Sequence, residues 1–480
     1  MLDSCTNYKL YVDRAVELGQ KAICFTEHGN IYNNIEKKMY ANSKGLKYLH
    51  GVEVYLTAAL EPKQRDNYHT ILIAKNFEGV KEINTLVDLS TQSDHMYYKQ
   101  RIKFDEFFNI SDNVIKISAC LASPLSKYPN FIGKLVDEKI AELEKNKETE
   151  ANRIYTELNS EAAKEAWIED YAAIYNTSYE IYVEQCVEKS NNAFDLQIEE
   201  VKSELENAKI VYDKLMKTYD YYEIQPHVKS MDQIRYNKML YEASKKYNKP
   251  LIAGTDTHSI DSYKAECRSI LQKAKHIEFS NEDEFDLTYK SYDELVDMFK
   301  QQGSLPMNVV LEAIENTNRM ADSVTDYELD TAFKYPILYD NEEEVFVERI
   351  YRMYHEKLDK GIIQPDPRYE ENIKEELRVF KKIGMVGFML FMSELVCWCW
   401  DNGIPIGFCR GSVGGSTIAY LTDMIDVNPV VWNTVFSRFA NEDRKEIGDI
   451  DLDIAPSQRH LVYEHIIEKF GADKTAYVLA

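Results

Sequence analysis

The first half of the chain alternates short apolar runs with amphipathic stretches. Six runs rich in β-branched and aromatic residues predict strands at 21–29, 47–56, 69–76, 113–122, 221–227 and 249–258. Most of these runs are continuously apolar, which favours parallel strands covered by helices on both faces. Residues 8–19 and 236–247 show helical spacing between them. The pattern predicts an α/β domain, built either as an open sheet or as a barrel.

Residues 134–220 differ in composition and interrupt this alternation of strands and helices. The segment contains neither glycine nor proline and is dense in Glu, Lys, Ala and Tyr. Such composition is typical of long, charged helices, and we expect a helical hairpin inserted between two strands of the first domain. The simplest interpretation is a solvated spacer or an arm that docks a partner, without chemistry of its own.

Helical patterns dominate the remainder of the chain. We expect an α/β domain at 1–280 that includes the insertion, a helical connector at 281–345, and a further α+β domain at 346–480. The last domain contains the most glycine-rich stretch of the chain, at 403–415.

Composition and charge exclude several classes of protein. The 480 residues are 44% hydrophobic, and no apolar run reaches the ~18 residues that a membrane span needs. The N-terminus lacks the pattern of a secretory signal, and eight scattered cysteines do not form a disulfide framework. We therefore expect a cytoplasmic protein without a membrane segment. The net charge of −24 argues against a protein that coats nucleic acid but allows an enzyme that holds it in one local groove.

Side chains that can bind metals follow or lie within most of the predicted strands. In a parallel α/β domain the carboxyl ends of the strands meet at one rim, where active sites lie. This mixture of carboxylates, imidazoles and one thiol suits zinc, manganese or iron better than calcium. Each residue taken singly is more often a hydrogen-bonded structural residue, and only their recurrence indicates a site. The residues are His28, Glu53, His69, Cys120, Asp256 and His258.

The motifs that carry these residues resemble those of PHP (polymerase and histidinol phosphatase) domains. They are TEHGN, GVEVYL, HTILIAKN, ISACLA and GTDTHS. The resemblance implies a distorted (β/α) barrel that binds a metal cluster, with Asp3 added to the ligands. In the family, a His-x-His pair on a first strand precedes the segment that MLDS resembles. We therefore expect an incomplete cluster in this chain, with Zn²⁺ or Mn²⁺ as the metals it would hold.

A glycine-rich loop and an acidic segment form a second group of motifs. The loop GIPIGFCRGSVGGS carries Arg410 and Ser412, and its small residues let a backbone approach phosphate oxygens. Taken alone, the loop could equally be a tight turn into a packed helix. Asp449, Asp451 and Asp453 follow at every second position, so on a strand they share one face. Carboxylates on one face can hold paired Mg²⁺ ions for phosphoryl transfer, whereas a solvated edge strand is the alternative.

The order and spacing of these motifs resemble the palm of family C DNA polymerases, the family of the bacterial DNA polymerase III alpha subunit. The resemblance implies that Asp449 and Asp451 hold catalytic Mg²⁺, with Asp453 as a less certain neighbour. It also implies residues that contact the triphosphate or lie in the family's arginine positions. These are Arg410, Gly411, Ser412, Arg438, Arg444 and Arg459.

The family implies template-directed DNA synthesis from dNTP and a primer 3′-OH. Its partners would be primer–template DNA and replication proteins such as a sliding clamp or a proofreading subunit. The family's third catalytic carboxylate lies beyond the matched region, so we expect this chain to be inactive alone. A second polypeptide carrying the rest would restore synthesis.

Two alternatives remain open. One is a metal-dependent phosphoesterase or 3′–5′ exonuclease centred on the barrel. The other is a non-catalytic scaffold or the subunit of a split polymerase.

Overall fold

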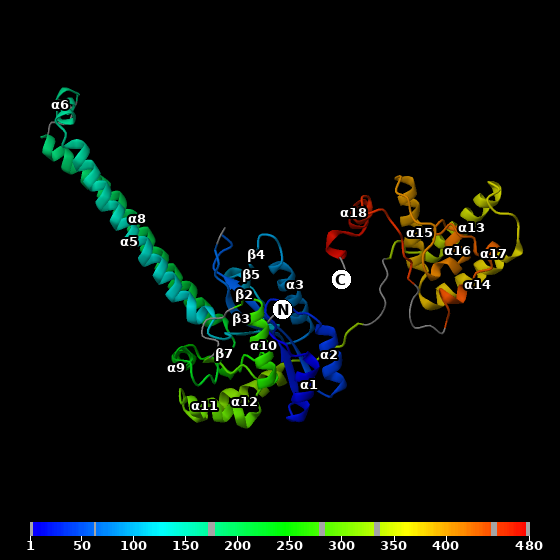
Figure 1. Cartoon of the computed structure of the whole chain (residues 1–480), viewed down its shortest axis with the longest axis horizontal. Helices are drawn as coiled ribbons and strands as arrows, with labels where there is room; N and C mark the ends of the chain where they lie inside the picture. The colour runs from blue at the N-terminus through cyan, green and yellow to red at the C-terminus, as the bar shows by residue number, and fades with distance from the viewer. Residues whose placement is uncertain are drawn as a thin grey trace. The chain divides into compact units, whose positions relative to one another are not determined.

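A computed structural model describes residues 3–61, 64–170, 178–277, 284–330, 337–442 and 449–476. The chain forms two compact units, Met1–Glu328 and Leu329–Ala480 (Figure 1). The predicted boundaries at 280 and 345 stay a prediction, and the two units are described in turn.

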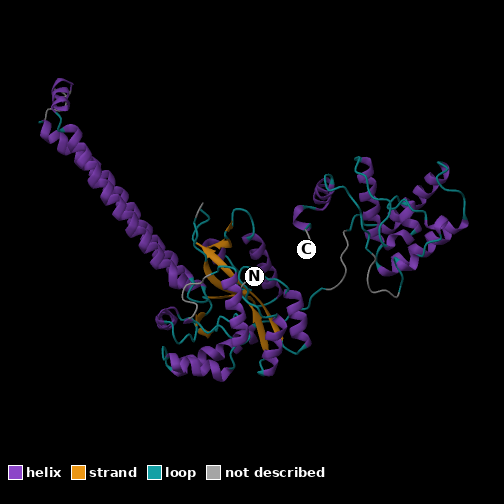
Figure 2. Ribbon diagram, in the orientation of Figure 1, coloured by secondary structure: helices purple, strands orange, loops and turns teal. Residues whose placement is uncertain are grey.

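A mixed sheet forms the centre of the first unit (Figure 2). β2 runs parallel to β1 and β5, whereas β3 runs antiparallel to both β2 and β6. A separate parallel pair, β7 and β8, continues from β6 through a bridge between Ile117 and Tyr221. The strands are β1 (Ala22–Phe25), β2 (Lys47–Thr57), β3 (Tyr68–Ala74), β4 (Met96–Tyr97), β5 (Lys99–Lys103), β6 (Val114–Ile117), β7 (Tyr222–Ile224) and β8 (Leu251–Ala253).

The predicted α/β class is confirmed, but the expectation of parallel strands is wrong for β3. Loop 58–67 joins β2 directly to β3, and strands joined by a short loop without a crossover helix pair antiparallel. A continuously apolar run does not distinguish the two cases when both faces of the strand are covered. Within the described residues the strands do not close into a barrel, although the arrangement agrees with the distorted barrel of the PHP resemblance.

Helices cover the sheet and complete the core of the first unit. Val52, Leu72, Ile83 and Phe107 are fully buried between them. α12 packs against β8, where its Asn316 side chain donates to the Leu251 carbonyl at 2.8 Å. The helices are α1 (Tyr8–Glu17), α2 (Asn34–Ser43), α3 (Phe77–Ser90), α4 (Phe104–Phe108), α9 (Met231–Tyr247), α10 (Ser262–Ala274), α11 (Tyr292–Gln302) and α12 (Met307–Ser323).

The predicted helical hairpin is confirmed and begins earlier in the sequence than expected. It consists of α5 (Pro124–Leu158) and α8 (Tyr179–Thr218), with the short α6 (Glu161–Asp170) near its tip. Ion pairs of Lys139 with Glu204 (2.8 Å) and of Lys147 with Asp195 (2.5 Å) fix the antiparallel register. The two long helices lie side by side and extend away from the sheet (Figure 1).

The regular elements of the second unit are helices in its described residues, connected by loops. Phe346, Ile373, Phe380 and Leu390 form its buried centre. The predicted acidic strand is reduced to one bridge, between Ile406 and Ile454, because no second strand lies beside it to extend the ladder within the described residues. The elements are α13 (Glu342–Asp359), α14 (Pro367–Ile383), α15 (Val386–Asp401), η2 (Ser412–Gly415), α16 (Thr417–Leu421), α17 (Pro429–Trp432), η3 (Phe436–Arg438), α18 (Arg459–Phe470) and η4 (Ala472–Lys474).

No single helix among the described residues has both the length and the apolar character to cross a membrane. Only α14 and α15 taken together pass that test, and they bend by 117° where they meet.

Candidate metal centre and nucleotide-binding loop

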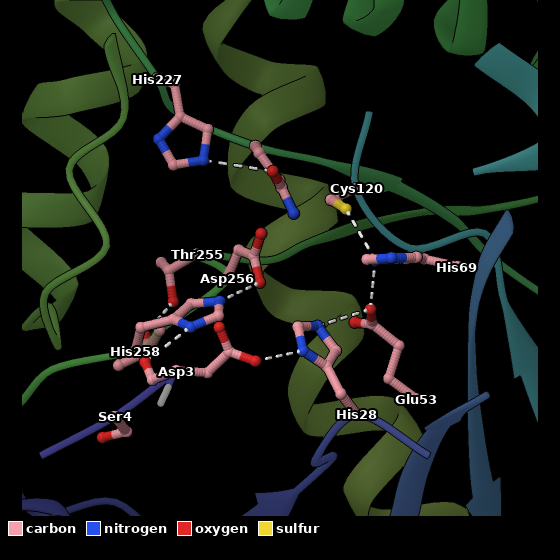
Figure 3. Close-up of polar contacts among 12 residues, drawn as sticks. Asp3, Ser4, His28, Glu53, His69, Cys120, His227, Thr255, Asp256 and His258 are labelled. Atoms are coloured by element: carbon pink, nitrogen blue, oxygen red, sulfur yellow. Dashed lines mark hydrogen bonds and ion pairs between the residues drawn. The ribbon is translucent and has the colours of Figure 1, made fainter. Parts of the chain in front are cut away.

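The six side chains predicted from the strand pattern meet in the first unit, together with Asp3, which the PHP resemblance implied (Figure 3). Contacts run from Cys120 Sγ to His69 Nδ1 at 3.6 Å, and from that nitrogen to Glu53 Oε1 at 2.5 Å. Glu53 Oε1 also contacts His28 Nε2 at 3.0 Å, and His28 Nδ1 lies 2.8 Å from Asp3 Oδ2.

The same chain of contacts continues from Asp3 to the last two predicted residues. The Asp3 carbonyl lies 3.0 Å from His258 Nδ1, and His258 Nε2 lies 3.2 Å from Asp256 Oδ1. Asp256 has φ of +48°, a left-handed backbone conformation that turns the chain directly after β8. The structure therefore brings all seven predicted residues into one network.

The cluster has the chemistry of a metal site. His28, Glu53 and His69 each offer a ligand atom, and these atoms lie within 4.8 Å of one another. Glu53 is only 4% exposed, so its carboxylate is held in place by the surrounding sheet. Two imidazoles with a carboxylate suit zinc or manganese, and the neighbouring Cys120 thiol adds a softer donor.

Contacts between histidines and carboxylates shift the pKa values of both kinds of group in this cluster. Burial alone would lower the pKa of His28, but hydrogen bonds to Asp3 and Glu53 raise that pKa to about 10. Burial would raise the pKa of Glu53, yet the neighbouring His69 and His28 lower it. A divalent cation would take over the role of these imidazolium charges, because it also favours ionised carboxylates.

Sequence reasoning missed three residues next to this cluster. Tyr55 is buried, with its ring against those of His28 and His69. Glu223 lies in β7 and His227 follows it, in the run YYEIQPH that the sequence pattern predicts as a strand. That run ends in a histidine as the ligand strands do, which is the signal that could have found His227.

Glu223 and His227 are both buried and linked through Gln225. The Gln225 amide donates to Glu223 Oε1 at 2.7 Å, and its Oε1 lies 3.1 Å from His227 Nε2. Burial raises the pKa of Glu223 to about 8 and lowers the pKa of His227 to about 4. Among the described residues, His227 Nδ1 is buried without a hydrogen-bond partner.

The glycine-rich loop and the acidic segment meet in the second unit. Ile406 bridges Ile454, and the Gly407 amide donates to the Asp453 carbonyl at 2.9 Å. Gly411 has φ of +76°, and a side-chain carbon there would lie 3.6 Å from Asp451 Oδ2. The loop backbone therefore lies beside the carboxylates in a left-handed conformation that favours glycine.

The predicted alternation along the acidic segment is present although the strand is not. Asp449, Asp451 and Asp453 are exposed, while the intervening Ile450 and Leu452 pack against the core. Arg410 lies across two of the carboxylates, with Nη1 2.9 Å from Asp453 Oδ1 and Nε 3.6 Å from Asp451 Oδ2. A cation thus already faces the carboxylates that were predicted to hold metals.

The remaining predicted phosphate contacts lie around this loop or outside the described residues. Ser412 begins η2, and Arg438 ends η3. η2 and η3 pack against each other, and Thr434, just before η3, donates from Oγ1 to the Gly414 carbonyl at 3.0 Å. Arg459 begins α18. Arg444 lies in 443–448, outside the described residues.

Comparison with known proteins finds one family match in each unit. Residues 1–161 match the PHP domain family, and residues 344–480 match the family described as bacterial DNA polymerase III alpha NTPase domain. The chain is similar to the bacterial DNA polymerase III alpha subunit. The DNA polymerase III subunit alpha of Aquifex aeolicus is 25% identical, and that of Borreliella burgdorferi is 26% identical, each aligned with 100% of this chain.

The DNA polymerase III alpha relatives are much longer than this chain. The chain spans 37% of the length of the Aquifex aeolicus protein and 36% of the length of the Borreliella burgdorferi protein. The relative from Campylobacter jejuni is 25% identical over the whole chain, which covers 37% of that protein. Each of these alignments covers both the metal-binding candidate cluster and the glycine-rich loop.

Proposed function

We propose that the chain carries the nucleotide-binding and metal-binding part of a cytoplasmic replicative DNA polymerase. The observation that supports this function best is the meeting of Gly411 and Arg410 with the carboxylates of Asp451 and Asp453. Phosphoryl transfer needs cations that hold a triphosphate beside carboxylates that hold metals. The polymerase III alpha relatives carry this activity in their name, which agrees with that chemistry.

Mg²⁺ fits the exposed carboxylates of this segment. Asp449 and Asp451 would hold the ions, and Arg410, Gly411 and Ser412 would contact the triphosphate, with Arg438 and Arg444 as further phosphate contacts. The ions would lower the charge on the triphosphate and favour the attacking 3′-oxygen. The protein's own contribution is placement, because the glycine loop fixes the phosphates relative to the acidic segment. Primer–template DNA and dNTP are the proposed substrates, with a sliding clamp or proofreading subunit as proposed partners.

Isothermal titration of a dNTP into the full chain with Mg²⁺ tests this function. We expect Mg²⁺-dependent binding by the wild type and its loss in Asp451→Asn. Asp359→Asn is the matched control, since Asp359 is an exposed aspartate at the end of α13 in the same unit. Equal dNTP affinity in wild type and Asp451→Asn would refute the metal role of the acidic segment.

A second function is supported by the seven-residue network of the first unit. Its carboxylates, imidazoles and thiol would hold Zn²⁺ or Mn²⁺ for hydrolysis of phosphoesters, including the 3′ end of DNA. We expect hydrolysis of a model phosphodiester to require Mn²⁺ and to be lost in His258→Ala but kept in His355→Ala, which changes an exposed histidine in the other unit. Hydrolysis that survives His258→Ala would refute this second function.

A further inference from the structure

Helix α14 places a carboxylate in the interior of the second unit. Glu376 is only 1% exposed, although it belongs to a residue type that is seldom buried without partners. Its oxygens point to the end of the glycine-rich loop. Oε2 accepts from Ser416 Oγ at 2.6 Å and from the Ile418 amide at 3.0 Å, and Oε1 accepts from the Thr417 amide at 2.7 Å.

A carboxylate is the only side chain of this shape that accepts all three of these bonds. A glutamine would turn an NH₂ group toward at least one backbone donor and leave that amide buried without an acceptor. Leaving a buried donor without a partner costs more than the bond itself contributes. The backbone after the loop is therefore held by the chemistry of Glu376, as well as by apolar packing.

The same helix makes further contacts beside the loop and with Glu442, which lies before the acidic segment. One turn before Glu376, the Asn372 amide donates to Thr417 Oγ1 at 2.9 Å. On the exposed side of α14, Arg378 and Lys382 both form ion pairs with Glu442, which precedes the acidic segment in the sequence. A single helix thus contacts the end of the loop and the approach to the carboxylates.

We infer that Glu376 is a positioning residue that fixes the glycine-rich loop for triphosphate binding. The inference rests on the proposed function of that loop. Glu376 itself is enclosed, so we assign it a role through the backbone that it holds and no contact with the triphosphate. It acts by holding the backbone from Ser416 to Ile418, which sets where the preceding residues, Arg410 to Ser412, lie relative to Asp451.

Glu376→Gln in the full chain tests the inference, with Glu371→Gln, an exposed residue of the same helix, as the matched control. We expect dNTP affinity in Mg²⁺ to fall roughly tenfold in Glu376→Gln, about the effect of losing one charged hydrogen bond. Hydrogen exchange should accelerate at the Thr417 and Ile418 amides and stay unchanged in α13. The control variant should match the wild type in both measurements.

The melting temperature separates positioning from stability. A residue that only stabilises the unit would lower the melting temperature and leave the affinity of the folded chain unchanged, and that result would overturn the inference. If Glu376→Gln does not fold, Asn372→Ala removes a single bond to Thr417 and should weaken dNTP binding in the same direction, by less. Wild-type affinity in Asn372→Ala would then overturn it.

The two proposals fail in different ways. A wild-type chain that binds no dNTP would refute the proposed function and, with it, the role of Glu376 in triphosphate binding. A wild-type chain that binds dNTP, together with a Glu376→Gln variant that binds it equally well, would refute the role of Glu376 alone.

Discussion

Glu223 carries a charge-burial cost that the variant Glu223→Gln should remove. The side chain is 6% exposed, and its Oε1 accepts from the Gln225 amide. The carboxyl group lies so close to Gly254 that any side chain at that position would overlap it. Because Gln has the same shape as Glu, the substitution changes the charge while leaving the packing intact.

The sign and size of the effect follow from the pKa of this group. Burial raises the pKa of Glu223 from 4.5 to about 8, so the folded chain binds the proton more tightly than the unfolded chain. The stability that this proton contributes is complete below pH 4.5 and is lost as the pH rises to about 8. The full pKa difference corresponds to an upper limit of about 5 kcal/mol. Relaxation and water entry reduce this, and we expect a gain of about 2 kcal/mol for Glu223→Gln at pH 9.

Urea unfolding followed by circular dichroism, in chelator to exclude metals, measures the difference between variant and wild type. We expect almost no difference at pH 4.5 and a growing advantage for Glu223→Gln up to pH 9. Glu266→Gln changes an exposed residue of α10 and should show no such trend. A difference that does not depend on pH would refute the reasoning, since it would mean that the Glu223 carboxyl has the same pKa in the folded and unfolded chain.

Two further predictions concern the glycines and the loop arginine. Gly79→Ala should destabilise the first unit by about 2–3 kcal/mol in urea unfolding, because the new Cβ would overlap the Asn113 carbonyl oxygen. Gly133→Ala, in open space on α5, should instead stabilise by about 0.5–1 kcal/mol, and equal effects of the two would contradict this. Arg410→Gln should bind Mn²⁺ more tightly in paramagnetic resonance titrations, because the guanidinium no longer competes for the carboxylates, whereas the exposed-residue control Arg352→Gln should not. Weaker Mn²⁺ binding in Arg410→Gln would contradict that competition.

Residue patterns predicted most of the fold in the first unit. Each of the six predicted strands overlaps an observed one, because apolar β-branched runs have few other ways to be buried. The sequence pattern did not predict β4 and β5, since β4 is short and KQRIK, the sequence of β5, is polar. Arg101 of β5 is nevertheless fully buried and donates to the Gln64 carbonyl. Strand direction could not be predicted from the sequence, because it depends on the connections between strands.

The candidate sites were predicted where their signal was local. His28, Asp256 and His258 follow apolar runs directly, and the structure brings them into one network. Glu376 could not be found in the same way, because a glutamate within EELRV resembles any charged position of an amphipathic helix. Its burial results from the packing of α14 against a loop that lies forty residues later in the sequence, at Ser416.

The hairpin of α5 and α8 has a consequence for how the chain folds. β6 and β7 are joined at Ile117 and Tyr221, although the whole arm separates them in sequence. Bringing such distant residues together costs little more entropy than closing a shorter loop, about 0.6 kcal/mol for each doubling. We expect the two helices to form early from local contacts, and their antiparallel pairing to bring the ends of the segment together before the sheet is complete. Pulse-labelled hydrogen exchange during refolding should therefore protect the amides of the arm before those of β7. That order would mean that formation of the arm brings β6 and β7 together.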